Sequence, residues 1–254
     1  MKPISLITPC YNASKTIRDT FESIRTQPPP AGLEYIVVDS NSTDGSSDLI
    51  SAAADIVTRH IREKDQGIYD GMNKGLRAAR GDVIGIINSD DTLTPGALNR
   101  LSREFQDESL DYIVSDVYTM DDAGRRTGII KAEPQWLTGR THLLGRDWRT
   151  KMVFPHPGVY VRRRVYESAG LFDTRYRLCA DHDFIARIIQ QGFKGRYIPD
   201  HPLANFRLGG QSSTNVEACL LEDERIAVAH GLPWSLARMI RLRKSNWARR
   251  NPLT

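Results

Sequence analysis

The stretch Gly81-Asp-Val-Ile-Gly-Ile-Ile-Asn-Ser-Asp90-Asp91 decides how this chain folds. Its apolar, β-branched run predicts a buried strand, and two adjacent carboxylates follow directly at the end of that strand. Two acids in this position are costly unless a cation lies beside them. Because Mg²⁺ and Mn²⁺ prefer oxygen ligands, the stretch indicates a site for a divalent cation. The alternative is a polar loop in which Asp90 or Asp91 caps a helix that begins near Pro95.

Strand-like and helix-like segments alternate on both sides of this stretch. Strands are predicted at residues 4–8, 35–38, 56–57 and 81–87, and helices at 17–24, about 46–50 and 67–79. This order predicts an α/β fold with a mostly parallel, Rossmann-like sheet and helices on both faces. Ligands of such sheets bind at the carboxyl ends of the strands, where Thr8 to Asn12, Asp39 and Asp90-Asp91 all fall.

The second half of the chain is less regular. Helices are predicted at 95–105, 163–169, 181–191 and 216–230 and after residue 233, and strands at 112–117, 158–162, 197–198 and 204–207. Residues 119–155 lack periodicity and are interpreted as short strands and a mobile, substrate-facing segment. We expect one domain over residues 1–215, with a donor half at about 1–118 and an acceptor half at about 119–215. A C-terminal basic helical tail at 216–254 would follow it.

Composition limits the class of protein. Of the 254 residues, 40% are hydrophobic and 26% charged, which is typical of a soluble globular protein. No apolar run approaches the roughly 20 residues that span a bilayer, and no secretory signal is visible. Three scattered cysteines give neither a metal-type spacing nor a disulfide framework. A cytoplasmic protein is therefore expected.

Five motifs occur in order along the chain: Thr8-Pro-Cys-Tyr-Asn12, Asp39-Ser-Asn-Ser-Thr-Asp-Gly45, Asp65-Gln-Gly-Ile-Tyr-Asp-Gly-Met-Asn-Lys-Gly75, Asn88-Ser-Asp-Asp91 and Ala180-Asp-His-Asp-Phe184. Together they resemble the inverting, GT-A-fold glycosyltransferases of family 2, especially the small bacterial enzymes of surface-polysaccharide and glycolipid assembly. The resemblance covers about residues 3–215. It implies a nucleoside-diphosphate sugar as donor, with UDP-sugars favoured over GDP-sugars, and Mn²⁺ or Mg²⁺ as cofactor.

The first two motifs have the chemistry of a nucleobase site. Pro9 ends the first strand, Tyr11 offers an aromatic face and Asn12 a planar amide. Asp39 can accept the imide hydrogen of uracil or the amino and imino hydrogens of guanine. The resemblance places these residues around the base. The alternatives are that Tyr11 is a packing aromatic and that Asp39 forms a turn.

The resemblance assigns the middle motifs to the ribose, the diphosphate and the cation. Asp65, Asn73 and Lys74 would approach the ribose and diphosphate. Asp91 matches the metal-binding carboxylate, with Asp90 holding the ribose or the waters of the cation. A cation on the diphosphate neutralises the charge that develops on the leaving group. The alternative for the Asp65 to Gly75 motif is a solvated first helical turn.

Inversion requires a carboxylate that deprotonates the acceptor hydroxyl on the face opposite the diphosphate. Asp181 matches the base of the family, although Ala180 stands where the family often has Glu. Asp183 is the alternative base, and either Asp can instead cap the helix.

The resemblance also implies residues near the acceptor and the diphosphate. It places His156 near the donor sugar and the acceptor. It places a glycine-containing loop at residues 206–213 over the diphosphate, with candidate contacts from Arg207, Gly210 and Ser212.

The segment after Glu224 contains no acid and seven basic residues: Arg225, Arg238, Arg241, Arg243, Lys244, Arg249 and Arg250. A helix after Pro233 would place Leu236, Met239, Ile240 and Trp247 on one side. Such a helix suits an anionic membrane at the inner face of the cell, or docking on the domain or on a second subunit in a homodimer. Nucleic-acid binding is not expected.

The sequence therefore predicts a metal-dependent, inverting glycosyltransferase that adds one sugar to a hydroxyl of a glycan or lipid-linked intermediate. Processive synthesis is not expected, because Gln-x-x-Arg-Trp and a membrane span are absent from the sequence. The alternative is a catalytically inactive nucleotide-sugar-binding module. A Rossmann dehydrogenase is excluded because no Gly-x-Gly-x-x-Gly follows the first strand.

Overall fold

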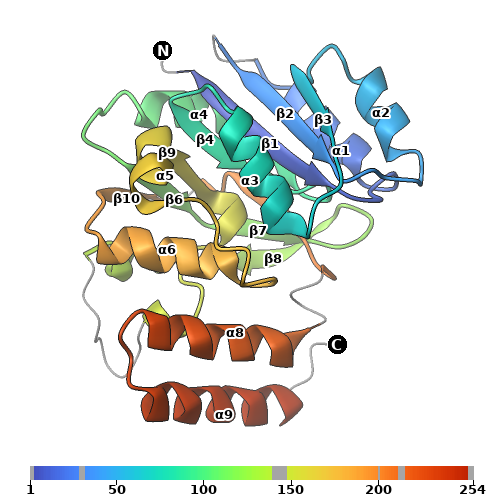
Figure 1. Ribbon diagram of the computed structural model, residues 1–254. Helices are drawn as coiled ribbons and strands as arrows, with labels where there is room; N and C mark the ends of the chain where they lie inside the picture. Colours follow the sequence, from blue (N-terminus) through green and yellow to red (C-terminus); the bar gives the residue numbers. More distant parts are fainter. Residues whose placement is uncertain (1–2, 29–31, 139–147, 200, 211–214, 251–254) are drawn as a thin grey trace.

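The protein is described by a computed structural model that places residues 3–28, 32–138, 148–199, 201–210 and 215–250. Its centre is a seven-stranded sheet with the order β10-β6-β9-β4-β1-β2-β3 (Figure 1). The strands are β1 (Ile4–Cys10), β2 (Glu34–Asp39), β3 (Arg59–Arg62), β4 (Val83–Ile86), β6 (Tyr112–Ser115), β9 (Val159–Arg162) and β10 (Gly195–Ile198). The third strand begins later than the predicted 56–57, where Ile56 and Val57 instead pack against a core cluster.

Most neighbouring strands of this sheet are parallel, as predicted. Strand β1 pairs in parallel with β2 and β4, β2 with β3, and β10 with β6. Strand β9 runs antiparallel to both β4 and β6. The chain leaves β6 at the carboxyl edge of the sheet and builds further structure there, so the next strand re-enters from that edge.

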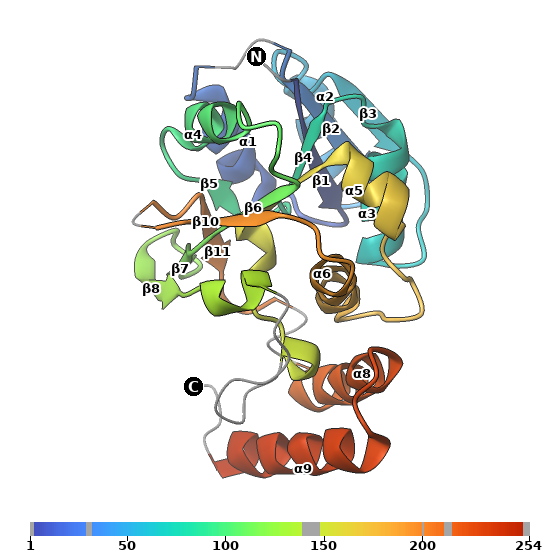
Figure 2. The ribbon, with the colours of Figure 1, turned by 90° about the vertical axis from the view of Figure 1, so that its left-hand side faces the viewer.

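Helices cover both faces of the sheet, because residues with opposite orientation along each strand are buried alike. Leu6, Tyr35 and Val37 belong to one apolar cluster, and their neighbours Ile7, Ile36 and Val38 to the other. Figure 2 shows α1 and α4 on one side of the strands and α3 and α5 on the other. The bounds are α1 (Ile17–Arg25), α2 (Ser46–Ala52), α3 (Ile68–Ala78), α4 (Ala97–Glu104), α5 (Arg163–Ala169) and α6 (Ala180–Gln190).

A second, four-stranded sheet was not foreseen from the sequence. It has the order β5-β11-β7-β8 and consists of β5 (Thr92–Leu93), β7 (Val117–Met120), β8 (Arg126–Ile130) and β11 (Ala204–Arg207). The predicted strand 112–117 breaks at Asp116, where the chain passes from the first sheet to the second. The Asp116 carboxylate accepts hydrogen bonds from the backbone of Ala132, from Lys131 and from Tyr197. These bonds fix the crossing point.

Three short 3₁₀ helices lie in the region that lacked periodicity: η1 (Pro134–Thr138), η2 (Trp148–Thr150) and η3 (His156–Gly158). The last two helices, α8 (Val216–Ala229) and α9 (Trp234–Arg250), form a hairpin at the end of the molecule remote from β2 and β3 (Figure 1). Helix α8 packs against α6 and η2, and α9 packs on α8. Within the described ranges, every helix is too short or too polar to cross a membrane.

Candidate active site

A cleft of about 1540 Å³ opens where the carboxyl ends of the parallel strands meet the second sheet, α6 and α8. It exceeds the roughly 300–1,000 Å³ of a site for one small ligand, so a donor and part of an acceptor have room together. The predicted residues that line it are Pro9, Tyr11, Asn12, Asp65, Asp90, His156, Asp181, Arg207 and Gly210. Those that do not are Asp39, Asn73, Lys74, Asp91 and Asp183. Ser212 lies outside the described residues.

The loop after β1 presents an aromatic ring to the cleft. Asn12 has a left-handed backbone (φ 50°), and its side-chain oxygen accepts a 2.9 Å hydrogen bond from the backbone of Thr43. The backbone N–H of Asn12 donates to the Ser42 hydroxyl at 2.9 Å. These bonds lock two loops together and leave Tyr11 66% exposed, which fits a stacking residue and not a packing one.

Asp39 is buried at the end of β2 and faces its own loop. Its Oδ1 accepts the Ser42 backbone N–H at 2.9 Å, and its Oδ2 accepts the Ser47 hydroxyl. Burial alone would raise the pKa of Asp39, but the hydrogen bonds from Ser42 and Ser47 outweigh burial and lower it. The geometry therefore matches the turn-forming alternative, and Asp39 acts on the cleft through the loop that it orders.

The Asp65 motif divides into a cleft residue and two structural ones. Asp65 lines the cleft, and its Oδ1 accepts the Gly67 backbone N–H at 3.0 Å. Asn73 is buried and exchanges two hydrogen bonds with the Phe172 backbone, at 2.9 and 3.0 Å. Lys74 donates to the Lys64 carbonyl at 2.6 Å and pairs with Glu63 at 3.0 Å. The structure thus corrects the expectation that Asn73 and Lys74 contact the donor, because their polar atoms are used within the fold.

The two carboxylates after β4 point in different directions. Asp91 is fully buried, and its Oδ1 accepts the Arg207 backbone N–H at 2.9 Å. Its Oδ2 accepts the Asn88 amide at 3.1 Å. Burial, together with the nearby Asp90 charge, raises the pKa of Asp91 well above its usual range. Asp90 is half-buried and lines the cleft. This corrects the expected division of labour, since the cleft-facing carboxylate is Asp90.

Arg207 is buried and its guanidinium is committed to the protein. It donates to the carbonyls of Asp90, Asp121 and Asp122 at 2.8–3.0 Å and pairs with Asp19 at 2.9 Å. These contacts join β11 to the loop after β4 and to α1. A direct contact with a diphosphate is thereby disfavoured, although the residue borders the cleft.

The donor set near Asp90 suits a divalent cation that substrate helps to bind. Asn88 also lines the cleft, and its side-chain oxygen is buried without a hydrogen-bond partner among the described residues. Within that same part of the chain, no cluster of three or more His, Cys, Asp or Glu residues is placed to hold a metal by itself. Mg²⁺ sites of one or two protein oxygens completed by phosphates and water are common. Asp90 and Asn88 fit that pattern.

The candidate base lies on another wall of the cleft. Asp181 stands in the first turn of α6, and its Oδ1 accepts the Tyr69 hydroxyl at 2.8 Å and the His182 backbone N–H at 2.9 Å. His156 lines the same cleft. Burial lowers the pKa of His156, and the nearby Asp181 charge opposes that shift. A neutral imidazole therefore accompanies the carboxylate.

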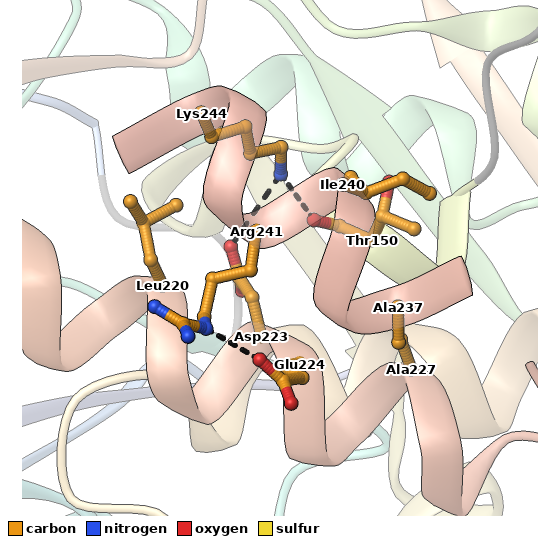
Figure 3. A pocket seen from close by; sticks show the side chains of 9 residues that line it. All are labelled: Thr150, Leu220, Asp223, Glu224, Ala227, Ala237, Ile240, Arg241 and Lys244. Carbon is orange, nitrogen blue, oxygen red and sulfur yellow. Dashed lines mark hydrogen bonds and ion pairs between the residues drawn. The ribbon is translucent and has the colours of Figure 1, made fainter. Parts of the chain in front are cut away.

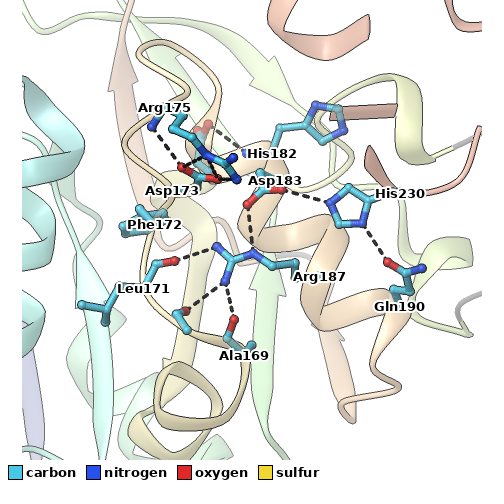
Figure 4. Close-up of polar contacts among 12 residues, drawn as sticks. Ala169, Leu171, Phe172, Asp173, Arg175, His182, Asp183, Arg187, Gln190 and His230 are labelled. Atoms are coloured by element: carbon cyan, nitrogen blue, oxygen red, sulfur yellow. Dashed lines mark hydrogen bonds and ion pairs between the residues drawn. The ribbon is translucent and has the colours of Figure 1, made fainter. Parts of the chain in front are cut away.

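Asp183 faces away from the cleft (Figure 4). It is buried and bonds Arg187 at 2.9 Å and His230 at 3.0 Å, while His230 also bonds Gln190 at 2.8 Å. Burial would raise the pKa of Asp183, but His230 and Arg187 lower it overall. This geometry disfavours Asp183 as the alternative base and assigns it to an ion pair between α6 and the end of α8.

Helix α8 supplies residues that sequence reasoning missed. The Glu222 carboxylate accepts the backbone N–H groups of Arg177, Leu178 and Cys179 at 2.8–2.9 Å, directly before α6. Asp223 lines the cleft and bonds the His182 ring at 2.7 Å. No local spacing indicates these contacts, because the partners lie 41 to 45 residues away. The segment expected as a tail therefore forms one wall of the cleft.

A doubly wound sheet with a second sheet at its carboxyl edge, and carboxylates on facing walls of one cleft, is the architecture of GT-A nucleotide-sugar transferases. The chain belongs to glycosyl transferase family 2, whose family model matches residues 5–170. This confirms the family and the fold class indicated by the five sequence motifs.

The chain is similar to two curated bacterial proteins. It is 26% identical to the uncharacterized glycosyltransferase EpsJ of Bacillus subtilis, over 88% of this chain and 66% of that protein. It is 27% identical to a PGL/p-HBAD biosynthesis glycosyltransferase of Mycobacterium tuberculosis, over 84% of this chain and 80% of that protein. The chain thus spans slightly less than two thirds of EpsJ.

Two solved structures share the fold. A fragment of S. aureus TarS in complex with UDP-GlcNAc superposes with a TM-score of 0.70 at 18% identity, over 92% of this chain and 69% of that chain. The mannosyltransferase PcManGT from Pyrobaculum calidifontis, in complex with GDP-Man and Mn²⁺, gives a TM-score of 0.65 at 17% identity. That match covers 100% of this chain and 76% of the other.

Proposed function

We propose that this protein transfers one sugar from a nucleoside-diphosphate sugar to an acceptor hydroxyl with inversion, and that it requires Mn²⁺ or Mg²⁺. The observation that carries the proposal is the placement of Asp90 and Asp181 on one cleft that is large enough for two substrates. One carboxylate serves the leaving group and the other serves the nucleophile.

The donor occupies the side formed by the ends of β1, β2 and β4. Tyr11 stacks on the base, and the loop ordered by Asp39 and Asn12 surrounds it. Asp65 binds the ribose. Asp90 and Asn88 hold the cation, with Asp91 orienting Asn88 through its 3.1 Å bond. When bound, the cation offsets the charge that develops on the departing diphosphate.

Asp181 acts as general base on the acceptor side. It takes the proton of the acceptor hydroxyl while the hydroxyl oxygen forms a bond to the anomeric carbon and the bond from that carbon to the diphosphate breaks. The Tyr69 hydroxyl holds Oδ1, and α8 holds the loop that precedes α6. His156, neutral beside Asp181, orients the acceptor or the donor sugar by hydrogen bonding.

The finer substrate assignments belong to the same proposal. TarS is described with UDP-GlcNAc and PcManGT with GDP-Man. We favour a UDP-sugar as donor and a glycan or lipid-linked intermediate as acceptor. The domain division at residue 215, a cytoplasmic location, a homodimer and attachment to an anionic membrane are proposals too.

The decisive experiment is a panel of UDP- and GDP-sugars, each with and without Mn²⁺, followed by thermal shift and by release of nucleoside diphosphate. We expect one donor to stabilise the protein only with the cation and to be consumed, by transfer or slow hydrolysis. The inactive binding module predicts stabilisation with no consumption. Release that persists in Asp181→Asn during transfer to an acceptor would refute the role given to the base.

A further inference from the structure

Helix α9 has two faces that differ in what they contact. We propose that its outward face is a binding surface for an anionic lipid bilayer. This surface does not depend on the proposed transferase activity, although it suits a lipid-linked acceptor.

The inward face docks on the protein (Figure 3). Ala237 is buried against Ala227 and Leu232, with Leu236 and Ile240 packed around them. Arg241 pairs with Glu217 and Glu224, and Lys244 donates to the Thr150 carbonyl. Ser245 donates to Glu217 at 2.7 Å. Two of the basic residues counted in the sequence are therefore used in holding α9 to α8 and η2.

The outward face combines apolar and basic side chains. Met239 is 41% exposed and Leu242 45% exposed, and they lie three residues apart on one side of the helix. Trp234 and Trp247, near the two ends of α9, are 59% and 65% exposed. The exposed basic residues of the helix are Arg238, Arg243, Arg249 and Arg250. This separates Met239 and Trp247 from Leu236 and Ile240, which the sequence pattern had grouped on one side.

Charge identifies the occupant of this face. No acidic residue follows Glu224, so four arginines surround the exposed apolar side chains without any acidic residue on the helix. A second copy of the same face would bring like charges together, which disfavours a dimer through α9. A nucleic acid would use the arginines but leave Met239 and Leu242 in water. An anionic bilayer accommodates both kinds of side chain, with Trp and Arg at the level of the headgroups.

The surface lies close to the cleft. Helix α8 contributes Cys219 and Asp223 to the wall of the cleft, and α9 packs directly on α8. Packed helices have axes about 8–10 Å apart. A membrane under α9 would therefore be roughly one helix layer from the site, within reach of an acceptor anchored in the lipid.

The test is co-sedimentation of the full chain with vesicles of phosphatidylcholine alone and with vesicles in which phosphatidylglycerol replaces part of that lipid. We expect binding to the anionic vesicles only, weakening with salt. The variant Arg238→Glu with Arg243→Glu should lose about 30-fold or more in affinity, from about tenfold or less per neutralised arginine and a further loss from the reversed charge. The control Arg77→Glu with Arg103→Glu makes the same change in net charge on α3 and α4 and should bind as the wild type does.

A second variant, Met239→Ser with Leu242→Ser, tests the apolar contribution and should also bind more weakly. Circular dichroism and the melting temperature must match the wild type in all three variants. Absence of binding, equal binding to both kinds of vesicle, equal losses in the outward and control pairs, or tighter binding to RNA than to anionic vesicles would overturn the proposal. Vesicle binding by Asp181→Asn should be unchanged, which keeps this outcome separate from failure of the proposed activity.

Discussion

The Tyr69 hydroxyl donates a 2.8 Å hydrogen bond to Oδ1 of Asp181, and it also lies 2.9 Å from the Leu178 carbonyl. This contact joins α3 to the first turn of α6 across 112 residues of sequence. Burial, reinforced by the Asp181 charge, raises the pKa of Tyr69 well above its usual range. The hydroxyl therefore remains a donor at every working pH and fixes the direction of the candidate base.

Tyr69→Phe should lower the turnover number about tenfold, in line with the lower range for one positioned acid–base contact. The ring keeps its packing on Phe172, so the melting temperature should change little. Without the donor, the acid limb of the pH–rate profile should move to higher pH, because a hydrogen bond to the ionised carboxylate is lost. Tyr166→Phe is the matched control, since its ring stacks on Phe184 in the same cluster. Equal kinetic losses in both variants would contradict the role of Tyr69.

Asp181 and Asp183 should separate activity from stability. Asp181→Asn should abolish transfer and leave the free energy of unfolding nearly unchanged. Asp183→Asn breaks a buried ion pair and should cost about 3 kcal/mol of stability. Chemical denaturation and turnover measured on both variants check this division, and the reverse pattern would identify Asp183 as the base.

Asp90 and Asp91 should differ in the same way on the donor side. Asp90→Ala should remove the Mn²⁺-dependent part of the stabilisation by donor, with little effect on the melting temperature of the free protein. Asp91→Ala leaves the Arg207 backbone N–H and the Asn88 amide without their acceptor, so it should cost about 2 kcal/mol even without metal. Thermal shift with and without Mn²⁺ and donor distinguishes the two. Loss of the cation effect in Asp91→Ala alone, in a protein that melts normally, would restore Asp91 as the ligand.

The sequence predicted the elements of the sheet well because each buried strand and covering helix leaves its own local hydrophobic pattern. Proximity to the cleft was predictable for Tyr11, Asp65, Asp90 and Asp181, which follow from the edge of a parallel sheet. The direction of each side chain was not, since it depends on partners distant in sequence. Asp91 turns toward Arg207 across 116 residues, and Asn73 toward Phe172 across 99.

Glu222 tests whether α8 belongs to the site. Glu222→Gln weakens three charge-assisted bonds to the loop before α6, so we expect a lower turnover number with nearly unchanged donor affinity. Glu224→Gln is the control on the same helix, because Glu224 contacts Arg241 of α9 instead of that loop. Hydrogen exchange at residues 177–182 should rise only in Glu222→Gln. The same change in both variants would reduce α8 to a general stabilising element.

His156 should make stability depend on pH in a defined window. Burial is the main cause of its lowered pKa, so the folded protein takes up the His156 proton at a lower pH than the unfolded chain does. Between the unfolded value of about 6.5 and the lowered folded value, the unfolded chain binds more protons, and the free energy of unfolding falls as pH falls. Above that window both states are neutral at His156 and the contribution is fully present. In His156→Gln this part of the slope should vanish, while the acid-induced losses from Asp39 and Asp183 at lower pH remain. Denaturation curves of both proteins at several pH values between about 5 and 7 measure the difference. Identical slopes would show that His156 does not change protonation on unfolding, and would remove the neutral imidazole from the wall of the cleft.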